Sequence, residues 1–519
     1  MPKFATNAVP RPAPAIYSNI SPWVDEQIWG HRLWDGQTPW LLFLEFLCVA
    51  EAREREGLLL QNGEIDKPLT FKPYKRMFLR NILFNSEFLS KFDQGGRDSN
   101  TAWREWLDWM GNKAKGVPTT DFSYLKSRFR SFSDFAALVS TVRSSAVESQ
   151  TNRRWTSRFV FPFGRNGLYE DLNIGPSGQG TREYINFGRT GELLYLMISR
   201  SSRAAELKPV LARLIGNQSQ WDTLLKLLQP TDDDDCSPRT AGYLPYAQHP
   251  QFDLLAEDWE SILRLELPGF DAFQHLVTLG ALHVVLYQLS VASEVCDGGR
   301  KIHFVCESIA PRKTLIRELS ASNFQENNVL SARAVEAYVA AVGESDAWRA
   351  AVEGGANEAD SFARCRAVLE KEVWWGEDYD GTGTAEALLG ELRDSVLRRH
   401  RRHVGNIHRV YGREVGLVSR RGTVKLRYAP TDALIKTLLL ANVPRRVELG
   451  EFLAKLYERY GIIFGDREAE QALPRGSFDE KRFRENTQRL EHRLSSLGML
   501  RRLSDACAYV ENPHTRTTS

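Results

Sequence analysis

Apolar positions near the carboxyl end of the chain recur with the period of an α-helix. Between residues 449 and 460, hydrophobic side chains stand three or four residues apart, which places them on one face of a helix. Gly461 follows directly and is suited to end that helix. A preceding helix is predicted to begin at Thr431 and to end before Pro444. Two helices separated by a short connection are therefore expected in this region.

A third helix and a hairpin are predicted to complete the region. The third helix is expected to begin at Ser477, where Ser477 and Glu480 can form a capping box, and to end at Gly498. Segments 499–503 and 507–511 then predict two strands joined by a tight turn. Three helices closed by a hairpin are in the order of a winged helix, which we expect over residues 429–514.

Helical periodicity also dominates the rest of the chain, with few strand-like segments. Helices are predicted over residues 39–56, 74–92, 101–110, 122–149, 191–200, 205–215, 220–228, 252–265, 270–292, 313–319, 332–342, 357–373 and 385–403. Residues 158–163 and 169–174 are predicted to form short strands or a structured loop. A strand is predicted over residues 301–306, and a hairpin over residues 415–418 and 423–428. The predicted fold class is mainly α, with minor β elements.

A chain of 519 residues exceeds the size of a single core, so several domains are expected. The acidic, proline-bearing run that begins at Thr231 is the best candidate for a linker. The predicted division is a flexible tail (1–18), a Trp-rich helical domain (19–230), an acidic linker (231–240), a helical middle domain (241–412), a basic β-hairpin connector (413–428), the winged helix (429–514) and a tail (515–519).

Composition excludes several classes of protein. Hydrophobic residues at 42% can fill large cores, and neither a signal peptide nor a membrane span is evident, so a cytoplasmic protein is expected. The six cysteines form no CxxC pair, and no metal site or cofactor is predicted. The glycine-rich segment 175–181 lacks the lysine of a phosphate-binding loop, so nucleotide hydrolysis is not expected.

Charge is nearly balanced overall, with 68 Lys and Arg against 66 Asp and Glu, yet residues 393–427 are strongly basic. Guanidinium groups in such a density favour the phosphates of a nucleic acid, although a solvated helix face or an acidic protein partner would explain them too. The predicted contacts in this stretch are Arg398, Arg399, Arg401, Arg402, Arg409, Arg413, Arg420 and Arg421.

The third helix of a DNA-binding winged helix enters the major groove, and its wing contacts the adjoining backbone. Lys481, Arg484, Gln488 and Arg489 are the predicted contacts on that helix, and Arg501 and Arg502 are those of the wing. Glu485 and Glu491 interrupt the same face, which fits a protein-docking module instead.

A ribonuclease interpretation of the basic stretch stays open. Arg398 with His403, or Arg402 with His408, has the arginine-to-histidine spacing of HEPN ribonucleases. The arginine would stabilise charge on the reacting phosphate, and the histidine would transfer the proton of the attacking hydroxyl.

Three segments, 159–164, 187–195 and 503–513, resemble accessory subunits of bacterial multi-gene antiphage clusters, in particular of the methylation-associated defence system. The resemblance implies a subunit that works beside a DNA methyltransferase, a specificity subunit and ATP-binding proteins, with foreign DNA as the target. It carries over no catalytic residue. The leading hypothesis is a non-enzymatic subunit that contacts DNA or supports assembly; the alternatives are a ribonuclease effector and a protein-docking scaffold.

Overall fold

The structure is a computed structural model. It describes residues 9, 24–31, 33–61, 67–85, 89–93, 97–117, 119–144, 164–168, 172–174, 180–182, 190–216, 220–231, 238–267, 271–308, 314–376, 378–420, 425–474, 476–503 and 507–515. The segment 158–163, predicted as a short strand or a structured loop, and most of the acidic linker lie outside these residues, as does Arg421. The protein is mainly helical, with 65% helix and 6% strand, as the sequence predicted.

The amino-terminal region packs helices around the long helix α2. Thr38 caps α2 by accepting a hydrogen bond from the Leu41 amide. Helix α2 packs on α8, and Gly191 of α8 lies against Leu42 and Phe46 of α2. A Cβ at Gly191 would lie 2.4 Å from the Leu42 carbonyl oxygen, so only glycine permits this close approach. The helices are α1 (Val24–Trp29), α2 (Pro39–Arg55), α3 (Met77–Phe84), α4 (Leu89–Phe92), α5 (Ser99–Lys113), α6 (Tyr124–Arg128), α7 (Phe132–Ser144), the 3-10 helix η5 (Arg165–Gly167), α8 (Thr190–Ser199), α9 (Ala204–Gly216) and α10 (Gln220–Leu227).

Two pairs of short strands accompany these helices. β1 (Thr70–Phe71) pairs with β4 (Arg239–Thr240), and β2 (Leu172–Ile174) pairs with β3 (Gly180–Arg182), both antiparallel. The predicted helices 74–92 and 122–149 are each divided in two, into α3 and α4 and into α6 and α7.

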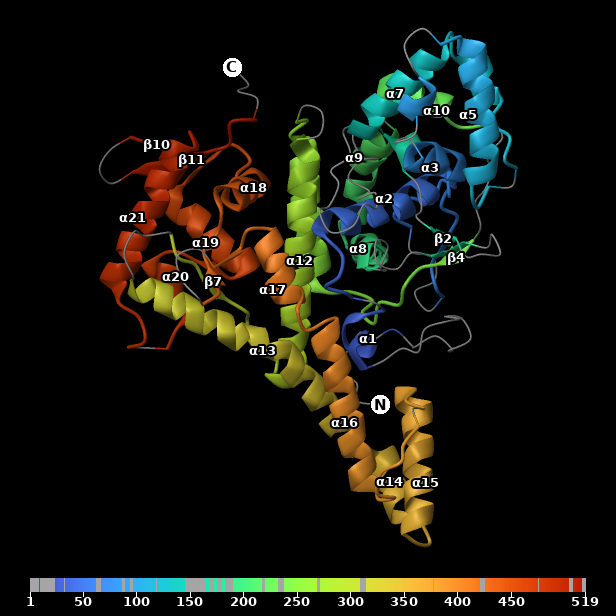
Figure 1. The fold of residues 1–519 in the computed structure, drawn as a ribbon. Helices are drawn as coiled ribbons and strands as arrows, with labels where there is room; N and C mark the ends of the chain where they lie inside the picture. Colours follow the sequence, from blue (N-terminus) through green and yellow to red (C-terminus); the bar gives the residue numbers. More distant parts are fainter. Residues whose placement is uncertain are drawn as a thin grey trace.

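The middle region is built on two long helices, α12 and α13 (Figure 1). Helix α12 is apolar and long enough to cross a membrane, but 94% of its apolar window is buried among α2, α11, α13 and α17. In Figure 1, α14, α15 and the first part of α16 extend from the body as an arm. The elements are α11 (Pro250–Arg264), α12 (Asp271–Cys296), β5 (Phe304–Val305), α13 (Leu315–Gly343), α14 (Asp346–Glu353), α15 (Glu358–Val368), the π-helix η6 (Leu369–Val373), α16 (Ala385–Arg402) and α17 (Ile407–Glu414).

The carboxyl-terminal region combines four helices with a small sheet. Its elements are β6 (Val418–Ser419), β7 (Arg427–Tyr428), α18 (Asp432–Asn442), β8 (Arg446–Glu448), α19 (Leu449–Tyr460), β9 (Ile462–Ile463), α20 (Asp466–Ala472), α21 (Glu480–Ser496), β10 (Leu500–Arg502) and β11 (Ala508–Glu511). β11 lies between β10 and β8 in a 3-stranded antiparallel sheet, and β6 pairs with β7. β9 pairs in parallel with β5 of the middle region.

Several local predictions for this region need correction. Asp479, not Ser477, caps α21, because its side chain accepts the hydrogen bond from the Arg482 amide. Neither α20 nor β8 is predicted by the residue pattern, since both elements are short. The predicted helices 313–319 and 332–342 form one continuous helix, α13, whose intervening positions contain many polar residues.

One cluster of buried hydrophobic residues extends from Val24 to Val510 and joins all three regions. A smaller cluster around Val305, Ile463 and Phe483 lies where β5 and β9 meet α21. The division into domains stays a prediction, but the described core is continuous across it. The carboxyl-terminal region is consequently held by the body through both strand pairing and side-chain packing.

Candidate nucleic-acid interface

The basic stretch folds into the end of α16, a tight connection and α17. His400 anchors the end of α16: its Nδ1 lies 2.7 Å from the Asp25 carboxylate, its Nε2 lies 3.1 Å from Ser331 Oγ, and its ring stacks on Trp29. The Gly405 amide then donates to the His400 carbonyl oxygen, which turns the chain towards α17. Because the buried positions are taken by apolar residues and His400, the arginines between them face solvent.

Five exposed arginines of this stretch are together called the arginine surface: Arg401, Arg402, Arg409, Arg413 and Arg420. No carboxylate of the described residues forms an ion pair with any of them, but the charge of Arg409 acts on the nearby Asp35 carboxylate. Arg409 and Arg413 are four residues apart on α17 and so share one of its faces. Arg409 also donates a hydrogen bond to the Asn406 side chain. An exposed guanidinium group that forms no ion pair can donate two hydrogen bonds to the oxygens of a phosphate.

Three further arginines of the stretch form ion pairs within the protein. Arg393 pairs with Glu336 of α13 at 3.0 Å, and Arg398 pairs with Glu391 at 2.8 Å. Arg399 lies 3.6 Å from Glu26 of α1. The pairs of Arg393 and Arg398 are solvent-exposed and can be exchanged for phosphate at small cost, whereas the pair of Arg399 involves the buried Glu26. All three pairs reduce the positive charge available to a nucleic acid.

Arg427 differs from these arginines, because its side chain is only 1% exposed and lies in the core. Its guanidinium pairs with the buried Glu307, which also accepts a hydrogen bond from Arg317 at 2.8 Å. Two cations around one enclosed carboxylate form a structural triad that ties β7 to α13. Sequence reasoning could not separate Arg427 from its exposed neighbours, since Glu307 is 120 residues away.

Helix α21 places its polar residues on the outer face and buries Phe483, Leu490 and Leu494, as the periodicity predicted. Leu497 was expected to face inward but is 37% exposed, because α21 ends one residue before it. The charges on the outer face are largely balanced: Arg484 pairs with Glu480 and, at 3.1 Å, with Asp466 of α20, and Arg489 lies 3.7 Å from Glu485.

The other residues predicted to contact DNA from the winged-helix region, on α21 and β10, differ in their environments. Arg502 of β10 lies 3.8 Å from Glu491. Lys481, Gln488 and Arg501 are exposed, and none has an ion pair within the described residues. The module thus presents fewer unpaired cations than the arginine surface does.

The two histidines of the ribonuclease hypothesis lie in unequal environments. His408 is 2% exposed, stacks on Phe324 and places its Nε2 2.8 Å from the Tyr428 hydroxyl. Burial lowers the pKa of His408 to about 3. A ring so enclosed cannot reach a nucleic-acid substrate. His403 is half-buried at the end of α16, beside Trp34.

Among the described residues, no group of His, Cys, Asp and Glu side chains is arranged to hold a metal ion. Comparison with known proteins gives no match: no family model, curated protein or solved structure shows significant similarity to the chain.

Proposed function

We propose that this protein is a non-enzymatic, DNA-contacting subunit of a bacterial antiphage complex, and that the arginine surface binds the phosphate backbone. The observation that carries the proposal is the set of five exposed arginines close together in the sequence, none of which forms an ion pair with a carboxylate of the described residues; only Arg409 has a carboxylate, Asp35, near enough for its charge to act on. Such a surface releases counterions from a polyanion and does not discriminate between base sequences.

The order of elements in the carboxyl-terminal region supports a winged helix as the second contact. Helix α18, strand β8, helix α19, helix α21 and the hairpin β10–β11 follow one another, and β11 lies between β10 and β8. The extra helix α20 between α19 and α21 departs from the simplest form of that fold. In this proposal α21 lies in a groove, with Lys481, Gln488 and Arg501 nearest the DNA.

The antiphage context rests on the resemblance of segments 159–164, 187–195 and 503–513 to accessory subunits of defence clusters. It gives a methyltransferase, a specificity subunit and an ATP-binding protein as partners. The cytoplasm is the proposed location, because no signal peptide is evident in the sequence. Docking of the winged module on one of these proteins is a second candidate function, favoured by the paired charges on α21.

DNA binding by the whole chain tests the proposal. We expect wild-type protein to bind a labelled DNA duplex with an affinity that falls steeply as salt rises. Replacing Arg401, Arg402, Arg409 and Arg413 by Gln is expected to weaken binding at least about 10-fold. The same replacement is expected to lower the salt slope by about 0.9 for each phosphate that is no longer neutralised.

The matched control removes four arginines from α13 and from the arm, at Arg333, Arg349, Arg364 and Arg366, and so makes the same change in net charge. This control is expected to bind DNA almost as tightly as wild type. Equal losses in both variants would mean that net charge alone drives binding and would contradict the proposed surface. Absence of DNA binding by wild type would leave the docking function.

A further inference from the structure

Two consecutive segments of the chain carry opposite charge. Residues 344–392, which include the arm, contain 12 Asp and Glu against 4 Lys and Arg. Residues 393–427 contain 11 Lys and Arg against 2 Asp and Glu. The sign changes within α16, so the start of this helix is acidic and its end is basic. One helix thus connects an acidic surface to a basic one.

Within one molecule, the arm lies apart from the arginine surface. Helices α14 and α15 pack on each other, α14 also contacts α13, α15 also contacts α16, and Figure 1 shows them projecting from the body. Seven carboxylates of this segment are exposed and form no ion pair within the part of the chain that the structure describes: Glu344, Asp346, Glu353, Glu358, Asp378, Asp380 and Glu386. Two of the arm's four cations are used locally, because Arg364 pairs with Asp360 and Arg366 pairs with Glu370. The arm therefore keeps an excess of negative charge.

The outer face of α16 carries charges of both signs. Its exposed residues recur three or four positions apart and so share one side of the helix: Glu386, Gly390, Asp394, Arg398 and Arg401. Helix α16 packs on α13 and α1 through its buried residues, which lie on the other side. A helix of a second molecule can consequently lie along the outer face.

Gly390 marks a point of close approach on this face. A glycine inside a helix costs about 1 kcal/mol relative to alanine. A Cβ at Gly390 would have no atom within 4 Å, so packing inside the molecule does not require a glycine at this position. A partner helix that crosses α16 here would come nearer to the backbone than a side chain allows.

From these observations we propose that two copies of this chain associate through α16, with the two helices antiparallel. When the two-fold axis passes between Arg393 and Asp394, Glu386 of each copy faces Arg401 of the other. In the same register Arg393 of each copy faces Asp394 of the other. The arm of each copy then points towards the arginine surface of the other, and opposite charges meet over the whole contact.

A second copy fits this face better than an unrelated basic protein does. The acidic and basic segments are of similar charge, follow each other along one helix and become complementary under a two-fold rotation. A parallel arrangement would place like charges opposite each other. The inference goes beyond the proposed function, because it needs the arginine surface only as a source of positive charge. Since Arg401 takes part in both, DNA and self-association are expected to exclude each other.

Sedimentation velocity of the full chain, without nucleic acid, tests the association. At low salt we expect a dimer with a Kd below about 50 µM, and a Kd that rises with salt because the contact is electrostatic. One variant removes four carboxylates of the arm by replacing them with the matching amides: Glu353, Glu358, Asp380 and Glu386. This variant is expected to raise the Kd at least about 10-fold.

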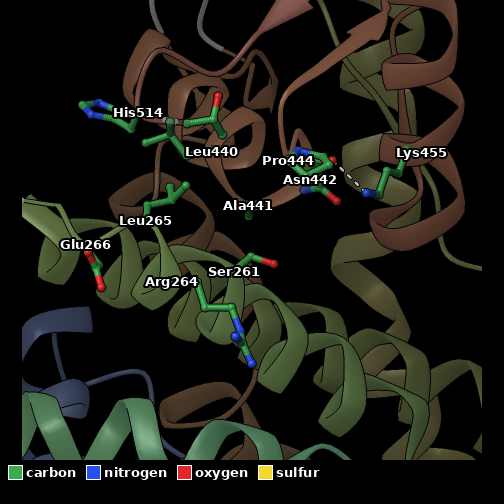
Figure 2. A pocket seen from close by; sticks show the side chains of 11 residues that line it. Ser261, Arg264, Leu265, Glu266, Leu440, Ala441, Asn442, Pro444, Lys455 and His514 are labelled. Carbon is green, nitrogen blue, oxygen red and sulfur yellow. Dashed lines mark hydrogen bonds between the residues drawn. The ribbon is translucent and has the colours of Figure 1, made fainter. Parts of the chain in front are cut away.

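The matched control makes the same change in net charge at four exposed carboxylates outside both surfaces: Asp108, Glu206, Glu266 and Glu470. Glu266 lines the pocket of about 550 Å³ beside Asn442 (Figure 2), and no residue of that pocket belongs to the arm or to the arginine surface. The control is expected to change the Kd less than about 2-fold. Equal losses in the two variants would mean that net charge alone governs association and would overturn the proposal.

A charge exchange tests the antiparallel register. Glu386→Arg and Arg401→Glu are each expected to raise the Kd at least about 10-fold, since each places like charges opposite each other. The double variant is expected to return to within about 3-fold of wild type. Monomeric wild type at up to about 200 µM in low salt would contradict the proposal, as would a double variant no better than the single ones. No DNA is present, so this result is independent of DNA binding.

Discussion

The imidazole of His283 lies 2.8 Å from the carboxylate of Asp258, and both side chains are enclosed where α11, α12 and α19 meet. Asp258 also accepts hydrogen bonds from Arg459 at 2.6 Å and from Tyr460 at 2.7 Å. Burial alone would raise the pKa of Asp258, but the hydrogen bond and charge of His283 and the charge of Arg459 hold that pKa below its ordinary value. One carboxylate therefore ties the carboxyl-terminal region to the body.

Asp258→Ala is expected to lower the free energy of unfolding by about 3 to 5 kcal/mol, because it leaves buried polar groups of three partners unsatisfied. Urea denaturation at pH 7 measures the change. Glu257→Ala removes the other carboxylate of Arg459, which is 40% exposed, and is expected to cost less than about 1 kcal/mol. Similar losses in the two variants would contradict a central role for Asp258.

Acid is expected to destabilise the protein through His408. The folded pKa of His408 is about 3, lowered by burial, whereas an unfolded histidine titrates near 6.5. The unfolded state binds more protons between these values, so stability present above pH 6.5 is lost as pH falls towards 3. Between pH 6.5 and 5, His408 alone accounts for up to about 2 kcal/mol.

Denaturation of wild type and His408→Gln at both pH values checks this expectation. The variant is expected to lose about 2 kcal/mol less than wild type on acidification. His492→Gln, at an exposed position of α21, is the control and is expected to behave as wild type. An identical pH dependence in all three proteins would contradict the assigned role of His408.

Gly461 is expected to tolerate no side chain. It ends α19 with a φ of +70°, and a Cβ there would lie 2.2 Å from the Ile302 carbonyl oxygen, next to the pairing of β5 with β9. We expect Gly461→Ala to destabilise the protein by about 2 to 4 kcal/mol. Gly450→Ala on the same helix, where the nearest atom is 3.7 Å away, is expected to be neutral or to stabilise slightly. Thermal denaturation distinguishes these outcomes.

The carboxylates on α21 are expected to restrain DNA binding by the winged module. Glu480→Gln with Glu485→Gln removes one of the two ion pairs of Arg484, which keeps Asp466, and frees Arg489 and Arg482 from Glu485. We expect this variant to bind DNA several-fold more tightly at low salt, with little change in stability. Glu370→Gln, which frees Arg366 of α15, serves as the control in fluorescence anisotropy. An affinity equal to that of the control would indicate that α21 does not face the DNA.

Local patterns in the sequence determined most of the helices. Helix α19 is the clearest case, because its apolar spacing and Gly461 are properties of neighbouring residues. The hairpin β10–β11 and the capping of α18 by Thr431 follow from equally local signals. The outer face of α21 and its buried residues were predictable for the same reason, except at Leu497, where the helix ends.

Interactions between distant residues decided the rest. The sequence placed Arg427 and Arg420 in one basic stretch, but Glu307 draws Arg427 into the core and leaves Arg420 exposed. His408 and His403 looked equally suited to catalysis until packing against Phe324 enclosed the first of them. The pocket beside Asn442 depends on α11, α18 and α19 meeting. Helical periodicity is a property of residues within a few turns of one another along the chain. Burial and charge pairing depend on which distant segments pack together, and only the tertiary structure determines that packing.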